Sequence, residues 1–400
     1  MDMAKPKIRF KGYQDDWEQR KCVSFATESC EKGHNGADAK KLTVKLHNKG
    51  VYEAEEINQG SNNTQYYIRH AGQFIYGKQN FFNGAIGVVP ECLDKYESTK
   101  DVPAFDIDDT VMVEWFYQYM ARPEIYKPQE QNCTGTGSKR FHVDNFLNMV
   151  VPTPFLEEQK KISDYFRSLD RLITLHQRKC DEAKKLKKFM LQKMFPQNGS
   201  LVPEIRFDGF TDAWEQRKLG EVCSRVQGND GRMDLPILTI SAANGWMKQE
   251  DRFSSTIAGR EQKNYTLLQK GELSYNHGNS KLAKYGTVFS LQSYEEALVP
   301  RVYHSFKVEM GNADFLEYYF ATKLPDRELG RLISSGARMD GLLNIGYDEF
   351  MGIRMMFPST KEQDRIADYL RNLDHLITLH QQKCDDLINL KKYMLQNMFV

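Results

Sequence analysis

The sequence predicts a mixed α/β (α+β) protein in which a pair of long antiparallel coiled-coil helices separates two similar globular domains. Two repeats lead to this prediction: a 38-residue helical segment occurs twice, and a 16-residue segment occurs once before each globular stretch. Length supports it, because 400 residues are too many for a single hydrophobic core. The expected architecture is therefore an internal pseudo-twofold repeat.

The first helical segment covers residues 158–195 and contains neither Pro nor Gly. Its apolar residues recur at three- and four-residue spacing, which is the period of one helix face. Thirty-eight residues at about 1.5 Å rise form a rod of roughly 57 Å. A second copy covers residues 362–399 at an offset of 204, with 25 of 38 positions identical. Pro154 and Pro358 precede the two rods and suit a helix entrance, where the missing N–H costs little.

Each rod carries an apolar stripe that needs a partner, because burial contributes about 25 cal/mol per Å² of apolar surface. The nearest matching stripe is the other rod, so we expect an antiparallel pair. Cys180 and Cys384 should be small buried residues at its seam, and His176 and His380 satisfied seam residues. The residues expected to pair the helices or dock other subunits are Ile162, Phe166, Leu169, Ile173, Ile366, Leu370, Leu373 and Ile377.

The second repeat is a leader segment. Residues 6–21 and 203–218 match at 11 of 16 positions, at an offset of 197. The two offsets differ by seven, so the first globular stretch is seven residues shorter, and the repeat is far longer than that of a solenoid. The expected boundaries are 1–152 for the first domain, 153–196 for the first rod, 197–202 for a linker, 203–357 for the second domain and 358–400 for the second rod.

The two globular stretches share little identity but should share a fold. Alternating residues predict short strands at 65–69 and 285–289, and apolar periodicity predicts helices at 110–120 and 313–324. A faint register at an offset of 199 aligns Gly72, Tyr76 and Gly87 with Gly271, Tyr275 and Gly286.

Composition narrows the class of protein. The chain has no run of 18 apolar residues, so no membrane span is expected, and its N-terminus lacks the apolar run of a secretory signal. Seven Cys without a CxxC pair favour a reducing cytoplasm over a disulfide framework or a zinc site. A net charge of +1 means that any surface for polyanions must be local.

Motifs of common chemistries are missing from the sequence. It contains no phosphate-binding P-loop, no dinucleotide fingerprint after a strand, no Asn/Asp-Pro-Pro-Tyr/Phe loop of amino-methyltransferases, no HExxH and no GxSxG. We therefore expect no catalytic residues, no metal site and no cofactor in this chain.

The globular stretches instead carry polar, Gly-containing loops with aromatic residues. Asn and Gln can pair with adenine, Arg and Lys can pair with guanine, and glycine lets a loop approach a groove closely. The DNA-binding candidates are Tyr76, Lys78, Asn80, Lys139 and Arg140 in the first stretch, and Tyr275, Asn276, Asn279, Lys281, Lys284 and Arg338 in the second. A lysine cluster at 184–193 is expected to be a solvated helix face, with phosphate attraction as the alternative.

Two motifs carry a resemblance that covers essentially the whole chain. Each leader reads I-R-F-x-G-[FY]-x-x-x-W-E-Q-R-K, and each rod begins E-Q-x-x-I-[SA]-x-[YF]-[LF]-x-x-[LI]-D-x-L-I. In this the chain resembles the specificity subunit of a type I restriction–modification system. The resemblance implies two target recognition domains that each read one half of an asymmetric, bipartite double-stranded DNA sequence. It also implies that the rods set the spacer between the halves and dock two methyltransferase subunits.

The resemblance further implies that ATP-driven restriction subunits join the complex through the methyltransferase subunits. Adenine methylation with S-adenosylmethionine, and translocation and cleavage with ATP and Mg²⁺, would then belong to the partners. Two other hypotheses remain open from the residues. The chain could be a coiled-coil scaffold whose domains bind proteins or glycans without DNA specificity, or a self-sufficient nuclease or methyltransferase with an unrecognised site. A neighbouring gene with methyltransferase motifs would favour the DNA specificity subunit over both alternatives.

Overall fold

The computed structural model describes residues 5–55, 64–135, 138–253, 259–278, 280–333 and 343–400. The chain divides into two compact units. Unit 1 consists of Met1–Gln177 with Gln382–Val400, and unit 2 consists of Arg178–Gln381. No helix in the described residues is long and apolar enough to cross a membrane.

The two predicted rods are present. Helix α4 runs from Leu156 to Lys193 and helix α10 from Thr360 to Asn397, each 38 residues long and two residues earlier than the repeat predicts. By the division of the chain, α4 begins in unit 1 and ends in unit 2, and α10 begins in unit 2 and ends in unit 1.

Within unit 1 the two helices run antiparallel. Phe166 stacks on Phe399, Asp170 Oδ1 lies 2.5 Å from Lys391 Nζ, and Gln177 lies beside Cys384. Residue numbers therefore rise along α4 where they fall along α10. The same holds in unit 2, where Cys180 faces Ile377 and Lys187 pairs with Asp374 at 2.6 Å. Cys180 and Cys384 are 1% and 3% exposed, which confirms their predicted place at the seam.

Unit 1 contains a four-stranded antiparallel sheet in the order β2-β10-β7-β8, a three-stranded sheet β3-β6-β9, and two strand pairs, β1-β11 and β4-β5. Its strands are β1 (Glu18–Lys21), β2 (Ala26–Ser29), β3 (Lys32–Asn35), β4 (Leu42–Lys45), β5 (Gly50–Glu53), β6 (Gln65–Arg69), β7 (Phe74–Tyr76), β8 (Ile86–Val88), β9 (Tyr96–Ser98), β10 (Ala104–Ile107) and β11 (Val150–Thr153). Its shorter α-helices are α1 (Val113–Met120), α2 (Pro123–Tyr126) and α3 (Val143–Leu147).

Unit 2 repeats this plan with the sheet β13-β20-β17-β18 and the pairs β12-β21, β14-β15 and β16-β19. Its strands are β12 (Glu215–Lys218), β13 (Cys223–Val226), β14 (Leu238–Ser241), β15 (Gly245–Lys248), β16 (Thr266–Gln269), β17 (Leu273–Asn276), β18 (Thr287–Ser290), β19 (Glu296–Val299), β20 (His304–Val308) and β21 (Arg354–Phe357). Its shorter α-helices are α5 (Leu219–Val222), α6 (Gln249–Phe253), α7 (Ala313–Ala321), α8 (Asp326–Leu332) and α9 (Tyr347–Met351).

The leader forms the same structure in both units. Its Glu-Gln-Arg-Lys end is strand β1 or β12, which pairs with the strand just before the long helix, β11 or β21. Its start is tied to the end of the other long helix: Ile8 N donates to Asn397 O in unit 1, and Ile205 N donates to Lys193 O in unit 2, both at 2.9 Å. The leader therefore joins the globular part of each unit to both long helices.

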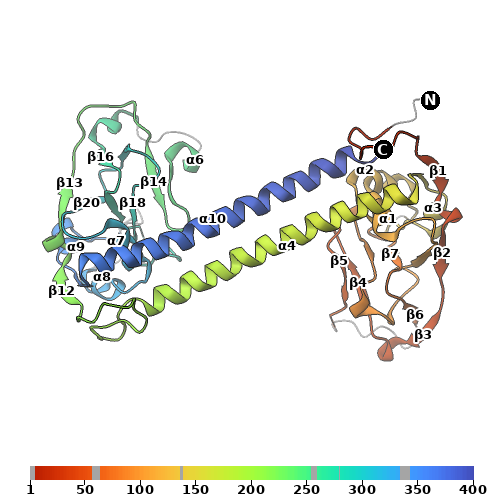
Figure 1. Cartoon of the computed structure of the whole chain (residues 1–400), viewed down its shortest axis with the longest axis horizontal. Coiled ribbons are helices and arrows are strands. Elements are labelled where there is room, and N and C mark those ends of the chain that lie inside the picture. The colour runs from red at the N-terminus through yellow and green to blue at the C-terminus, as the bar shows by residue number, and fades with distance from the viewer. Residues whose placement is uncertain (1–4, 56–63, 136–137, 254–258, 279, 334–342) are drawn as a thin grey trace. The chain divides into compact units, whose positions relative to one another are not determined.

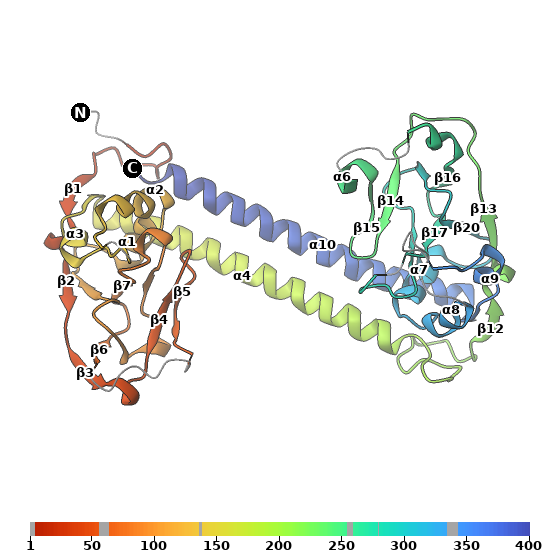
Figure 2. The ribbon, with the colours of Figure 1, turned by 180° about the vertical axis from the view of Figure 1, so that it is seen from behind.

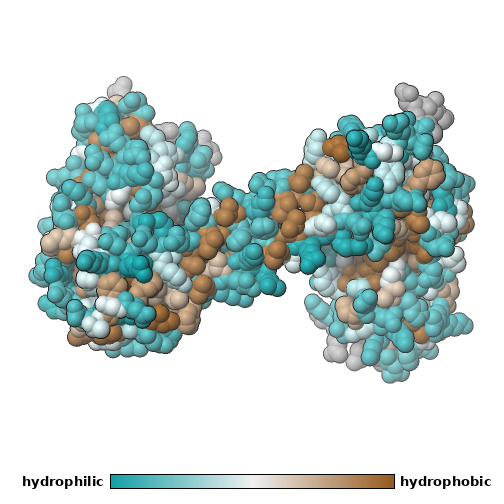
Figure 3. Space-filling view, in the orientation of Figure 1, coloured by the Kyte–Doolittle hydropathy of each residue, from teal (hydrophilic) through white to brown (hydrophobic). Residues whose placement is uncertain are grey.

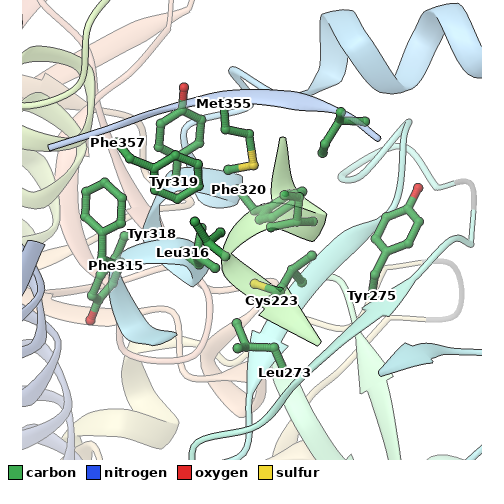
Figure 4. Close-up of a cluster of buried hydrophobic side chains, with 14 of the residues drawn as sticks. Cys223, Leu273, Tyr275, Phe315, Leu316, Tyr318, Tyr319, Phe320, Met355 and Phe357 are labelled. Atoms are coloured by element: carbon green, nitrogen blue, oxygen red, sulfur yellow. The ribbon is translucent and has the colours of Figure 1, made fainter. Parts of the chain in front are cut away.

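Each hydrophobic core includes the long helices. In unit 1 the start of α4 lies beside α1, as Figures 1 and 2 show, and Trp115 and Phe116 of α1 share a core with the end of α10. In unit 2 the aromatic residues of α7 pack with β13, β17 and β21 (Figure 4) and with the end of α4. Phe195 there stacks on Phe315 at 5.5 Å between ring centroids.

This packing corrects part of the predicted docking surface, although Phe166 does pair the two helices through Phe399. Six of the eight residues expected to pair the helices or dock subunits are at most 6% exposed and belong to the unit cores, because the globular parts cover that face: Ile162, Phe166, Leu169, Ile366, Leu370 and Leu373. They leave no surface for another subunit. The remaining two, Ile173 and Ile377, are partly exposed.

Candidate nucleic-acid interface

A buried ion pair fixes the frame of each unit. Arg9 of the first leader binds Glu158 through two hydrogen bonds of 2.7 and 2.8 Å, and Arg206 binds Glu362 through two of 2.7 Å. Both glutamates are buried, and the hydrogen bonds raise the pKa of Arg9 and Arg206 above its ordinary value. The motifs that carry the family resemblance are therefore structural clamps.

The glutamine after each glutamate completes the clamp. Gln159 accepts a hydrogen bond from Met112 N, just before α1, and donates one to Pro154 O. Gln363 accepts from Asn312 N, just before α7, and donates to Pro358 O. Each glutamine thus ties the globular helix to the entrance of the long helix.

The candidate DNA-reading loop of unit 1 lies between β7 and β8, at residues 77–85. Ala85 N donates to Asn80 O at 3.0 Å and closes the loop. Phe141 N donates to Lys78 O at 2.8 Å, so the second candidate segment, at 138–140, adjoins the first. Asp101 joins them further, because its carbonyl accepts from Lys78 N and its carboxylate lies 3.4 Å from Arg140.

The corresponding loop of unit 2 lies between β17 and β18, at residues 277–286, of which 279 is not described. Leu343 N donates to His277 O at 2.8 Å, which repeats the bond between Phe141 and Lys78. Lys281 and Lys284 are exposed. Asn279 and Arg338, which the sequence also singled out, lie outside the described residues.

Two candidates must be withdrawn as DNA-contacting residues. Tyr76 and Tyr275 are 0% exposed. Tyr76 stacks on Phe105 at 5.8 Å and Tyr275 on Phe350 at 4.3 Å, so each ring lies in the core beneath its loop. Their sequence register is confirmed by their matching places in β7 and β17, but the repeat reflects packing.

Two asparagines position their loops. Asn276 uses both ends of its amide internally, donating to Ile240 O at 3.2 Å and accepting from Gly278 N at 3.0 Å. Asn80 accepts from the amide of Asn83 at 3.2 Å.

On the surface, Lys139 pairs with Glu130 at 2.6 Å. Lys78, Lys139, Arg140, Lys281 and Lys284 are left as the candidates with accessible, cationic side chains.

Sequence reasoning missed a hairpin beside each loop. In unit 1 the tip of the β4–β5 hairpin packs on the candidate loop at 77–85, with His47 N donating to Asn83 O and Asn48 N to Gly84 O. In unit 2 the β14–β15 hairpin meets the loop through Ile240 and the residues after it. The signal in unit 1 was available: residues 40–52 contain four lysines and no acidic residue.

The long helices also present a repeated surface. Several large apolar residues are 38–54% exposed, and Figure 3 shows hydrophobic side chains at the helix surface among hydrophilic ones. These residues occur at equivalent places in the two repeats, so that each unit presents the same set: Leu172, Leu175, Leu390 and Tyr393 in unit 1, and Leu376, Leu379, Leu186 and Phe189 in unit 2.

Comparison with known proteins agrees with this architecture. Residues 106–185 match a family model described as the type I restriction modification DNA specificity domain. The type I restriction enzyme MjaVIII specificity subunit of Methanocaldococcus jannaschii is 23% identical over 352 residues, which cover 81% of this chain and 74% of that protein.

Two solved structures also match the chain. The S subunit of a type I restriction–modification system from M. genitalium matches in fold, with a TM-score of 0.58, 11% identity and 99% of both chains covered. The HsdS subunit from Thermoanaerobacter tengcongensis matches with a TM-score of 0.49 and 15% identity, over 97% of this chain and 98% of that one. Together with the two duplicated motifs, the family match and the curated relative place this chain among the specificity subunits of type I restriction–modification systems, the non-catalytic subunits that select the DNA target.

Proposed function

We propose that each unit is a target recognition domain that reads one half of an asymmetric, bipartite sequence in double-stranded DNA. The observation that carries this proposal is the contrast between an identical frame and different loops. Both units have the same buried Arg–Glu ion pair and a four-stranded sheet with the same strand order. In each unit a hairpin packs against the loop that follows the third strand in that order, which is β7 in unit 1 and β17 in unit 2. The loops and hairpin tips on that frame differ in sequence and charge, as two readers of different half-sites require.

The long helices would fix the separation of the two half-sites. Half-sites one helical turn apart lie about 34 Å from each other, and a 38-residue helix is roughly 57 Å long. Adding one helical turn to each of α4 and α10 should then lengthen the unspecific spacer while the half-site sequences stay the same. Methylome sequencing of the altered system would measure both quantities.

We further propose that the long helices dock two copies of one partner, the methyltransferase subunit. Positions 172–177 and 376–381 are identical in the two repeats, and most of their residues are exposed. Internal packing does not constrain exposed residues, whereas the same partner bound to each unit would constrain both copies alike.

A groove at equivalent places in the two units adds to this support. In unit 1 it has a volume of about 450 Å³ and is lined by the residues after α1, by Asp170 and Ile173, and by Lys391, Lys392 and Leu395. The groove in unit 2, of about 930 Å³, is lined by the corresponding Asp374, Ile377, Lys187, Lys188 and Leu191. Two matching grooves fit two identical partner segments.

Restriction subunits would join through the methyltransferases, and S-adenosylmethionine, ATP and Mg²⁺ would bind to these partners. Within the described residues, no group of three or more His, Cys, Asp or Glu side chains could hold a metal ion. All seven cysteines are free thiols, which fits a complex that acts in the reducing cytoplasm.

Methylome sequencing of the host with and without this gene tests the proposal. We expect one bipartite adenine-methylation motif with two different halves to disappear on deletion and to return with the gene. If no such motif is lost, the chain does not select DNA in the host, and the scaffold hypothesis replaces this one. The matched control is a chain with Leu201→Ala, an exposed linker residue, which should restore the motif.

A further inference from the structure

The loop between β17 and β18 presents an unusual apolar side chain. Leu282 is 67% exposed, the largest fraction among the large hydrophobic residues of the described chain. A lone exposed leucine is ordinary on a protein surface. The setting of Leu282 distinguishes it, since it stands in the polar loop that unit 2 would use to read DNA.

The backbone holds Leu282 in place. Ser280 and Ala283 exchange two backbone hydrogen bonds of 3.2 Å, and the hydroxyl of Ser280 accepts a third from Ala283 N at 3.1 Å. Ala283 itself is 3% exposed and anchors the turn in unit 2. Leu282 is thus displayed on a closed turn, and little conformational entropy remains to be lost when a ligand covers it.

The surroundings of Leu282 indicate the chemistry of that ligand. Lys281 and Lys284 on the same turn are exposed, and two positive charges beside an apolar side chain suit a polyanion that also offers an apolar group. Leu282 also lines an open cleft of about 410 Å³ with the small residues Ala242 and Ala243 of the adjacent hairpin tip.

We propose that Leu282 reads a thymine in the half-site of unit 2 by packing against its C5-methyl group in the major groove, while Lys281 and Lys284 contact the flanking phosphates. The proposal rests on the proposed function of unit 2. The thymine methyl is the apolar group that base edges offer in the major groove. Unit 1 lacks this device, because no large hydrophobic side chain of its corresponding loop, at residues 77–85, is exposed.

Replacing thymine by deoxyuridine tests the contact, because it removes only the methyl group. The probe is a duplex that carries the motif found by methylome sequencing, with each thymine of both halves replaced in turn, and the full chain is used with its partner subunits. We expect one replacement to weaken binding about fourfold, which corresponds to about 0.8 kcal/mol for one buried methyl. With Leu282→Ala this penalty should vanish, and penalties in the other half should stay.

Two further variants serve as controls for the loss of the Leu282 side chain. Leu282→Met keeps an apolar side chain of similar reach and should keep the penalty, whereas Leu201→Ala makes the same deletion at another exposed site of unit 2 and should change nothing. A wild-type chain that shows no penalty at any thymine, or a penalty that persists in Leu282→Ala, would overturn the proposal. If the unmodified motif binds no better than a scrambled duplex, the proposed function fails instead.

Discussion

At the scale of residues, the two Arg–Glu clamps explain why the leader and the start of the long helix are similar in the two repeats. Glu158 and Glu362 are 0% and 1% exposed, so each carboxylate depends on its arginine for compensation. Removing one partner of a buried pair leaves a desolvated charge, and this usually costs more than the pair itself contributes. Neither half of the clamp can therefore change alone.

Arg9→Ala should destabilise unit 1 by about 3 kcal/mol, because it leaves the Glu158 carboxylate buried without a cation. Chemical denaturation followed by tryptophan fluorescence would measure this loss, since Trp17 and Trp115 lie in the same core. Lys7→Ala removes an exposed cation two residues away and is the matched control. Equal stabilities of the two variants would show that the clamp contributes nothing.

Sequence reasoning singled out the loops after β7 and β17 as candidates but included residues that the fold buries. Tyr76 and Tyr275 looked like DNA-binding residues because they recur beside Gly, Asn and Lys, whereas alternation along β7 and β17 directs them into the core. Asn276 looked free to read a base, and only the fold shows that Ile240, 36 residues away, takes its amide. Contacts between segments far apart in sequence leave no local pattern to read.

At the scale of elements, each long helix has two apolar surfaces with different surroundings. One, which includes Leu169, is buried in a unit core, and the other, which includes Leu172, is exposed. The periodicity predicted both helices to within two residues, because a 38-residue amphipathic pattern is unambiguous. It could not tell a stripe covered by a globular domain from one left exposed, since both are apolar at helical spacing.

An aspartate at Leu169 and an aspartate at Leu172 should have different effects, because one residue is buried and the other is exposed. Leu169→Asp places a carboxylate in the core of unit 1 beside Phe166, and should lower stability by more than about 3 kcal/mol. Leu172→Asp meets water, and should leave the folded state intact but weaken binding of a methyltransferase subunit. Thermal denaturation measures the first effect, and native mass spectrometry of the assembled complex measures the second.

The comparison has a built-in control in the second repeat. Leu376→Asp should reproduce the effect of Leu172→Asp in unit 2, and a chain with both changes should lose both partner copies. A full complement of partners on the double variant would remove the exposed leucines from the docking surface. A strong loss of stability in Leu172→Asp alone would show that this face is part of the internal packing.

At the scale of the whole molecule, the two units are one fold with two surfaces. Sheet order, hairpin position and clamps coincide although the globular sequences have diverged, and the seven-residue length difference falls in the connections between matching strands. The frame was predictable because it is encoded by near-identical segments. The surface of the candidate loops was not, because its side chains are positioned by contacts with a hairpin distant in sequence.

This division predicts that the globular part can be exchanged without the frame. Replacing residues 219–353 with a copy of residues 22–149 keeps both leaders, both long helices and the strands that pair beside them. Because α1 packs against Phe166 where unit 2 has Leu370, the exchange should include Leu370→Phe. The new chain should direct methylation to a sequence whose two halves are the same, with the original spacer, since both units would then carry one reader.

Methylome sequencing distinguishes the outcomes of this exchange. Two identical halves at unchanged spacing would assign reading to the globular parts and spacing to the helices. Retention of the original asymmetric motif would place specificity in the leaders or helices, and a changed spacer would mean that the globular parts contribute to the separation. The reciprocal chain, with two copies of residues 219–353 and Phe166→Leu, should yield the other half twice and so identify which unit reads which half.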